Sequence, residues 1–233
     1  MRMNGNTILI TGGSTGIGYS MAKYFHDLRN TVIICGRRKD RLEQAAEALK
    51  GIHIIECDVA KQDDRNMLFE YVSTNFPNIN MLINNAGIQR DIDLTKGISD
   101  LASGDSEISI NFEAPVYLSA LFTPLLSGKD NAVIVNVSSG LAFMAANASG
   151  MPIYCATKAG LHAFSIAQRI QLAPIGIKVV EIIPPMVESE LNYESRKKRN
   201  MLTSPYMLTS DEFVRIVFEK MEQDVDEIRI ERQ

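Results

Sequence analysis

The stretch Thr7-Ile8-Leu9-Ile10-Thr11-Gly12-Gly13-Ser14-Thr15-Gly16-Ile17-Gly18 predicts how this chain folds. Its first four residues form a short apolar run typical of a buried strand. Glycines at 12, 16 and 18 permit a tight turn and let backbone amides approach a phosphate closely. A helix that begins at about residue 17 would present free N–H groups to the same turn, so the stretch favours a dinucleotide-binding unit. A glycine-rich loop without a ligand is the alternative.

Short apolar runs alternate with longer helical stretches along the rest of the chain. After 7–10, the predicted strands are 31–34, 52–55, 81–83, 132–137 and 178–183. The predicted helices are 17–28, 39–50, 62–76, 105–127, 153–173 and 210–222. The runs are rich in β-branched residues and mostly do not alternate, as expected for strands buried on both faces. We therefore expect an α/β fold with a doubly wound parallel sheet of about six or seven strands, helices on both faces, and one domain over 1–233.

Composition excludes several classes of function. The 233 residues carry a formal net charge of -4, and nucleic-acid binding would need a basic face. No apolar run approaches the roughly 18 residues that span a membrane, and we expect no membrane partner. The three cysteines, Cys35, Cys57 and Cys155, lack metal-ligand spacing, so we predict free buried thiols, no metal site and a cytoplasmic location.

The residues after the second predicted strand indicate which dinucleotide binds. An acidic residue at this point would bind the ribose diol of NAD. The sequence instead reads Cys35-Gly36-Arg37-Arg38-Lys39. A 2′-phosphate pairs with a guanidinium and is repelled by a carboxylate. We therefore predict NADP(H) rather than NAD(H), with Arg37 or Arg38 on the phosphate; a solvated basic helix start is the alternative.

Tyr154 and Lys158 form a possible acid–base pair in the helix 153–173. Residues four apart share a helix face, so the ammonium can lie near the phenol. A cation at about 4 Å would favour phenolate by up to about 4 kcal/mol at an effective dielectric of 20. We expect this to lower the tyrosine pKa and make Tyr154 a general acid or base. The pair alone is a weak signal.

Taken together, the motifs resemble the short-chain dehydrogenase/reductase family over nearly the whole chain. The residues that carry the resemblance are Thr11–Gly18, the step Cys57-Asp58-Val59, Asn84-Asn85-Ala86-Gly87, Asn111, Val135-Asn136-Val137-Ser138-Ser139, and Tyr154 with Lys158. The local sequences Ser139–Phe143 and Ile183-Pro184-Pro185 are similar to those of a bacterial subgroup labelled DltE-type oxidoreductases. The resemblance implies a Rossmann-type fold and hydride transfer between nicotinamide and a carbonyl or secondary alcohol.

The resemblance also implies roles for individual residues. Tyr154 would exchange the proton, Lys158 would lower its pKa and hold the nicotinamide ribose, Ser139 would bind the substrate oxygen, and Asn111 would anchor a water. The implied nucleotide contacts are Gly12, Ser14, Thr15, Gly16, Ile17, Gly18, Arg37, Arg38, Asp58, Val59, Asn85, Ala86, Gly87, Tyr154, Lys158, Pro184, Val187 and Ser189. Taken singly, Ser139 could be a strand-end cap and Asn111 a residue that bonds back to its own helix.

Some features depart from the family pattern. Ser138 competes with Ser139 for the catalytic role, and the spacing from Ser139 to Tyr154 is longer than usual, with the extra residues in Ala145–Gly150. Pro185 replaces the usual glycine after the sixth strand and stiffens that turn. The usual C-terminal strand is missing or reduced to Glu227–Ile230. We expect 187–208 to form the substrate loop.

The sequence leaves two other functions open. One is a non-catalytic dinucleotide-binding regulator, although such proteins typically lose the tyrosine or the lysine. The other is an epimerase or dehydratase that retains its cofactor, although these usually have longer C-terminal regions. The family resemblance further implies a homodimer or homotetramer that packs through the helix 153–173 and the one near 112–126.

Overall fold

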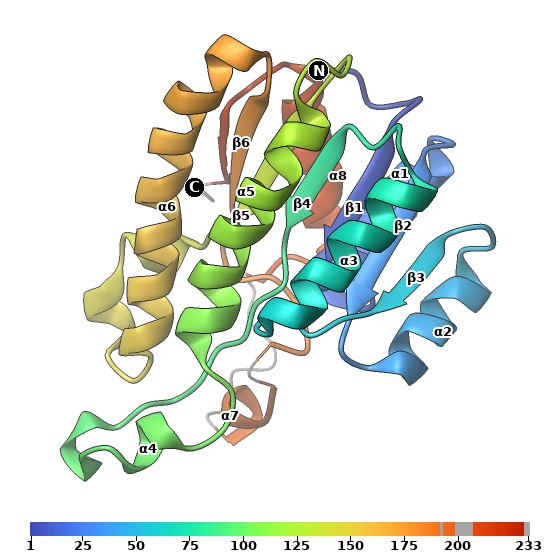
Figure 1. The fold of residues 1–233 in the computed structure, drawn as a ribbon. Coiled ribbons are helices and arrows are strands. Elements are labelled where there is room, and N and C mark those ends of the chain that lie inside the picture. Colours follow the sequence, from blue (N-terminus) through green and yellow to red (C-terminus); the bar gives the residue numbers. More distant parts are fainter. Residues whose placement is uncertain (192, 199–206, 231–233) are drawn as a thin grey trace.

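The structure is a computed structural model that describes residues 1–191, 193–198 and 207–230. Its centre is a sheet of seven parallel strands in the order β3-β2-β1-β4-β5-β6-β7 (Figure 1). The strands are β1 Thr7–Thr11, β2 Thr31–Gly36, β3 His53–Glu56, β4 Met81–Asn84, β5 Val133–Val137, β6 Lys178–Ile183 and β7 Glu227–Arg229. The predicted doubly wound parallel sheet is confirmed, and the last strand is reduced to three residues.

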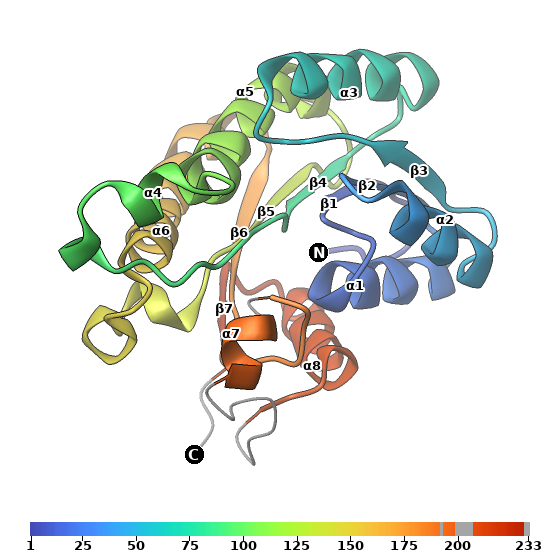
Figure 2. The same cartoon turned by 90° about the horizontal axis from the view of Figure 1, so that it is seen from below.

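Helices cover both faces of this sheet (Figure 2). They are α1 Gly16–Asp27, α2 Lys39–Ala48, α3 Gln62–Asn75, α4 Ser99–Ala102, α5 Ala114–Leu126, α6 Pro152–Leu172, α7 Tyr193–Lys198 and α8 Ser210–Glu222. α1, α2 and α8 lie on one face, and α3, α5 and α6 lie on the other. Strands buried between two helical layers need apolar side chains on both faces, which explains the unalternating runs in the sequence.

Each face of the sheet has its own apolar core. On the α1 and α8 side, Phe25 and Phe213 are completely buried and pack with Ile8 and Ile10 of β1. On the α3 and α5 side, Phe122 is buried with the β1 residue Leu9. Successive side chains of β1 thus enter opposite cores, as the two-residue period of a strand requires. β1 is fixed from both sides, and so is the turn that follows it.

The sheet order places this turn where the chain reverses direction across the sheet. From β1 the chain runs outward to β2 and β3, then returns to β4 on the other side of β1. In open parallel sheets, ligands bind outside the carboxyl ends of the strands at such a point. None of the described helices is long and apolar enough to cross a membrane.

The predicted helix 105–127 differs from the structure near its start. Ser109–Glu113 form a π-helical turn, and the α-helix α5 begins only at Ala114. A π turn contains one extra residue, and such turns are frequent at functional sites. Asn111 lies inside this turn and is buried.

Candidate active site

The glycine turn after β1 is held tightly against the end of β4. The Asn85 side-chain amide donates to the carbonyl oxygens of Thr11, at 2.9 Å, and Gly12, at 3.1 Å. Gly12 has a φ of +63°, and a Cβ placed there would lie 2.9 Å from the Cα of Ala86. A Cβ on Gly18 would lie 2.2 Å from the Gly12 oxygen. Only glycine fits these positions, so the turn is a cradle built from bare backbone.

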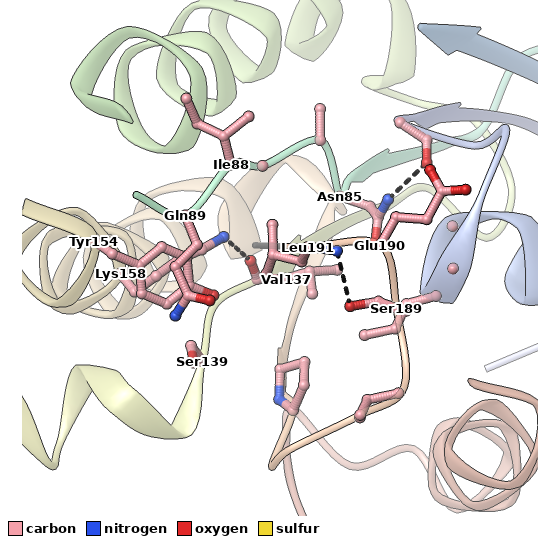
Figure 3. A pocket seen from close by; sticks show the side chains of 18 of the residues that line it. Asn85, Ile88, Gln89, Val137, Ser139, Tyr154, Lys158, Ser189, Glu190 and Leu191 are labelled. Atoms are coloured by element: carbon pink, nitrogen blue, oxygen red, sulfur yellow. Dashed lines mark hydrogen bonds between the residues drawn. The ribbon is translucent and has the colours of Figure 1, made fainter. Parts of the chain in front are cut away.

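A cavity of about 780 Å³ opens at the carboxyl ends of the strands (Figure 3). Every nucleotide contact implied by the sequence lines it, from Gly12 in the glycine turn to Ser189 after β6. Tyr154, Lys158 and Ser139 lie towards one end of the pocket, and Ser189 and Glu190 lie towards the other. The volume falls within the range of roughly 300–1,000 Å³ typical of cofactor and ligand pockets. The size of the cavity, its glycine cradle and the two arginines in its wall suit a dinucleotide.

The two arginines after β2 both have carboxylate partners. Arg37 Nη1 lies 2.5 Å from an oxygen of Asp105. Arg38 Nη1 lies 2.8 Å from Glu190 Oε2, and its Nη2 donates to the Thr15 hydroxyl at 3.3 Å. Each arginine side chain is about half exposed (43% and 50%), so these ion pairs are exchangeable surface contacts rather than buried anchors. A second anion could replace the carboxylates on the same guanidinium groups.

α6 positions Tyr154 and Lys158 on one face, as predicted. The Lys158 ammonium lies 5.8 Å from the centroid of the Tyr154 ring and donates to the carbonyl oxygen of Val137 at 2.8 Å. Both residues are buried: 6% of the Tyr154 surface and 4% of the Lys158 surface are exposed. The helix therefore brings a phenol and an ammonium to the end of β5 inside the cavity.

Burial controls the ionisation of both groups. Burial raises the pKa of Tyr154 to about 12, and a hydrogen bond with Ser139 opposes this rise. Burial lowers the pKa of Lys158 to about 8, and the charge of Glu181 opposes this fall. The lowered tyrosine pKa expected from the Tyr154–Lys158 spacing is therefore wrong for this structure, because the cost of removing the phenolate from water outweighs the hydrogen bond with Ser139.

The two adjacent serines after β5 point to different neighbours. The Ser138 hydroxyl donates to Glu181 Oε1 at 2.5 Å. The Ser139 side chain lines the cavity, shares a hydrogen bond with Tyr154, and accepts from the Leu141 amide at 3.2 Å. Ser139 is therefore both a helix cap and a neighbour of the phenol. Of the two serines, Ser139 is the one that hydrogen-bonds with Tyr154.

Asn111 lies in the π-helical turn and is completely buried. Its Oδ1 accepts from the Ile88 amide and its Nδ2 donates to the Ile88 carbonyl oxygen, each at 2.8 Å. A Cβ on Gly87 would lie 3.3 Å from Asn111 Oδ1 and 3.5 Å from the Lys158 ammonium. The amide thus fixes the segment after β4 beside Lys158, and the water-anchoring role remains a prediction.

The extra residues between Ser139 and Tyr154 form a short 3-10 helix, Ala145–Ala148, beside the cavity. Met144, Met151 and Met186 also line the cavity. Of the expected substrate loop 187–208, residues 192 and 199–206 lie outside the described part of the chain. At its two ends, Val187 and Leu208 form an isolated parallel bridge.

Sequence reasoning missed several cavity residues and contacts. Gln89 and Asn147 line the cavity but belong to no motif. The pairing of Glu190 with Arg38 joins residues 152 positions apart and has no local signal. A signal did exist for the buried Glu181, because a carboxylate interrupts the apolar run of β6.

Comparison with known protein families yields one match over most of the chain. The model described as short chain dehydrogenase matches residues 6–200. The chain is 46% identical over 232 residues to a Bacillus subtilis (strain 168) protein named uncharacterized oxidoreductase DltE, covering 100% of this chain and 90% of the relative.

Solved structures resemble the fold closely. A short-chain dehydrogenase from Sphingobium yanoikuyae in complex with NADPH has a TM-score of 0.80 and 26% identity, covering 96% of this chain and 87% of that one. A short chain dehydrogenase/reductase from Burkholderia phymatum in complex with NAD has a TM-score of 0.85 at 18% identity, covering 98% and 89%; at this identity the likeness shows the fold alone. The two neighbours carry different dinucleotides.

Proposed function

Because the chain belongs to the short-chain dehydrogenase/reductase family of oxidoreductases, we propose that it is an NADP(H)-dependent enzyme that interconverts a carbonyl compound and a secondary alcohol. One observation carries this proposal. Ser139, Tyr154 and Lys158 line one end of the cavity, and its wall also contains the glycine turn and the two arginines. Acid–base groups and a dinucleotide cradle in one cavity are what a hydride-transfer enzyme requires.

When bound, the nicotinamide cofactor supplies or accepts the hydride. The chain's own residues would handle the proton and the substrate oxygen. The Tyr154 hydroxyl would donate its proton to the oxygen as negative charge develops there, while the Ser139 hydroxyl donates a second hydrogen bond to the same atom. A phenol with a pKa of about 12 carries its proton at neutral pH, as a proton donor in carbonyl reduction must. The raised pKa also makes it a weaker acid, so the phenolate left behind has to be stabilised by its neighbours.

Lys158 and Asn111 would support this proton transfer. The Lys158 ammonium would hold the nicotinamide ribose and stabilise the phenolate that remains after Tyr154 has given up its proton. Asn111 would keep the segment after β4 against the cavity through its two bonds to Ile88, and would anchor a water. Removing the side chain of Lys158 or of Asn111 should therefore lower the turnover rate more than it lowers the free energy of unfolding.

The preference for NADP(H) rests on the residues after β2. Arg37 and Arg38 line the cavity, and no carboxylate occurs in the sequence from Cys35 to Lys39. A 2′-phosphate would compete with Asp105 and Glu190 for the two guanidinium groups, and its larger charge favours the phosphate. Pro184 and Val187 would contact the nicotinamide half, and Ser189, which lies beside Gly16 of the glycine turn, would contact the dinucleotide nearer its phosphates.

Tyr154→Phe tests the proposal. The variant loses the proton donor but keeps the ring, so NADPH oxidation with an accepted carbonyl from a broad panel should fall by at least about a hundredfold, while NADPH affinity stays nearly unchanged. Tyr71→Phe is the matched control, because Tyr71 is exposed on α3 and is not a cavity residue. Full activity in Tyr154→Phe would show that the proton donor is misassigned.

The same assay separates the two other functions. Steady NADPH oxidation supports the dehydrogenase. Binding of NADPH without turnover across the panel would indicate a regulator, and a changed product without net NADPH oxidation would indicate an epimerase or dehydratase. Each outcome is read from nucleotide absorbance together with product analysis.

We also propose that the protein is a homodimer or homotetramer. The family resemblance implies assembly through α5 and α6, and these helices expose the large apolar side chains Tyr117, Ile166 and Ile170, which contact with a second copy would bury. A monomeric mass by light scattering at micromolar concentration would contradict this assembly.

A further inference from the structure

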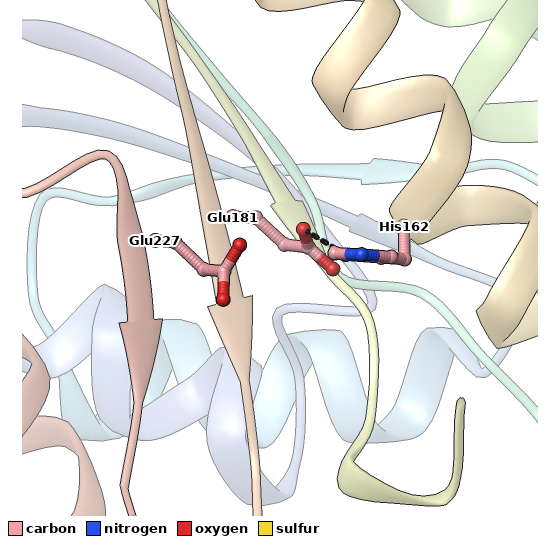
Figure 4. Close-up of side chains that lie close together, drawn as sticks. All are labelled: His162, Glu181 and Glu227. Carbon is pink, nitrogen blue, oxygen red and sulfur yellow. Dashed lines mark hydrogen bonds and ion pairs between the residues drawn. The ribbon is translucent and has the colours of Figure 1, made fainter. Parts of the chain in front are cut away.

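Three ionisable side chains outside the cavity lining, His162, Glu181 and Glu227, lie close together (Figure 4). Glu181 of β6 has no exposed side-chain surface. One of its carboxylate oxygens accepts from the Ser138 hydroxyl at 2.5 Å, and the other lies 2.8 Å from His162 Nδ1. Glu227, its register partner on β7, is exposed. Burying a carboxylate is costly, and the proposed reaction does not use Glu181 directly.

Both partners of Glu181 are connected to the surroundings of Lys158. His162 follows Lys158 by four residues on α6, so the two side chains share a helix face. Ser138 follows Val137, whose carbonyl oxygen accepts from the Lys158 ammonium at 2.8 Å. Glu181 is therefore tied through one oxygen to the helix turn after Lys158, and through the other to the strand end that holds the ammonium.

Lys158 needs a counter-charge in this position. Lys158 is 4% exposed, and its ammonium donates to the neutral carbonyl oxygen of Val137. Burial lowers the pKa of Lys158 to about 8, and Glu181 is the charged group that opposes this fall. Without that opposition, a buried lysine would lose its proton at a lower pH.

We propose that Glu181 is a positioning residue whose buried carboxylate, oriented by Ser138 and His162, keeps the Lys158 ammonium charged. Its importance for catalysis rests on the proposed function, but its effect on Lys158 does not. Other titratable or charged groups surround Lys158 and Glu181. They are Tyr154 and His162 on α6, Glu107 just before the π-helical turn, and Glu227 and Arg229 on β7.

A divalent cation is the competing explanation of the cluster. Ligand-type atoms of His162, Glu181 and Glu227 all lie within 4.8 Å of one another. However, both oxygens of Glu181 already have hydrogen-bond partners, so this carboxylate is satisfied without an ion. The geometry fits a hydrogen-bonded network better than an open set of ligands, and metal binding becomes one outcome of the test.

The ionisation of Lys158 can be measured directly. In protein labelled with ¹³C at lysine Cε, the Lys158 signal is assigned by its loss in Lys158→Arg and followed from about pH 6 to about pH 10. Glu181→Gln removes the charge but keeps the shape, so the Lys158 midpoint should fall by about one pH unit, a tenfold change in its protonation equilibrium. Glu227→Gln is the matched control and should move the midpoint much less, since Glu227 is exposed to water.

A second variant guards against misfolding of Glu181→Gln. Ser138→Ala removes one of the hydrogen bonds that orient Glu181 and should move the Lys158 midpoint in the same direction by a smaller amount. An unchanged Lys158 midpoint in a folded Glu181→Gln, or in Ser138→Ala if Glu181→Gln does not fold, would overturn the proposal. So would tight binding of Zn²⁺ or Mn²⁺ to the wild type, measured by calorimetry, that Glu181→Gln and Glu227→Gln both abolish.

The pH dependence of NADPH affinity is the functional readout. If the Lys158 ammonium holds the ribose, NADPH affinity is fully present below the lysine pKa and is lost as the pH rises through about 8. In Glu181→Gln this loss should begin at lower pH, which a merely structural role would not produce. A shifted midpoint in a protein that does not use NADPH would leave the inference standing and would reject the proposed function.

Discussion

Arg38→Gln is expected to weaken NADPH binding while leaving NADH binding nearly unchanged. Arg38 lines the cavity between Thr15 and Glu190, where its two terminal nitrogens make contacts of 3.3 Å and 2.8 Å. Hydrogen bonds to charged groups contribute about 1.5–3 kcal/mol, and half exposure of this side chain moves the value to the low end. NADPH affinity should therefore fall about tenfold.

Nucleotide fluorescence titrations at low and at physiological salt measure this effect. The difference between the variant and the wild type should shrink as salt rises, because screening weakens the contact between Arg38 and the phosphate. Arg41→Gln is the control, since Arg41 also pairs with Glu190, at 3.3 Å, but is not a cavity residue. Equal losses of NADPH and NADH affinity in Arg38→Gln would refute the assignment of Arg38 to the 2′-phosphate.

Three further predictions follow from specific contacts. Glu190→Gln should tighten NADPH binding by up to about fivefold in the same titration, because a surface ion pair of at most about 1 kcal/mol no longer competes for the arginine; weaker binding would contradict this. Gly12→Ala should abolish nucleotide binding, since its Cβ would meet the Ala86 backbone at 2.9 Å and φ is +63°; wild-type affinity would show that the turn is not the cradle. Phe213→Ala should cost about 3–5 kcal/mol in urea unfolding because the ring is completely buried, whereas Ile98→Ala, at a 73% exposed site, should cost little.

Much of the fold could be predicted because local sequence and buried environment agree. The β1 run and the glycine turn are readable from the residues themselves, since an apolar run and a positive φ each leave a local trace. The π turn at Ser109–Glu113 has no such local trace in the sequence, so the predicted helix 105–127 includes these residues as ordinary α-helix. The sequence predicts the last strand only as missing or reduced to Glu227–Ile230, because the three residues of β7 are too few to show a strand period.

The candidate site was harder to predict where it depends on three-dimensional placement. Ser138 and Ser139 are adjacent in the sequence, and only the structure shows that the first contacts Glu181 and the second contacts Tyr154. The catalytic role of Ser139 stays a prediction. The raised pKa of Tyr154 could not follow from its spacing to Lys158, because burial depends on the whole cavity.

The bridge between Val187 and Leu208 couples one wall of the cavity to the C-terminal helix. Leu208 donates to the Met186 carbonyl at 3.2 Å, and the Glu188 amide donates to the Leu208 carbonyl at 2.8 Å. These bonds hold Val187, a cavity residue, against Leu208, which immediately precedes the Thr209 cap of α8. The burial of α8 against the sheet therefore also secures this part of the cavity wall.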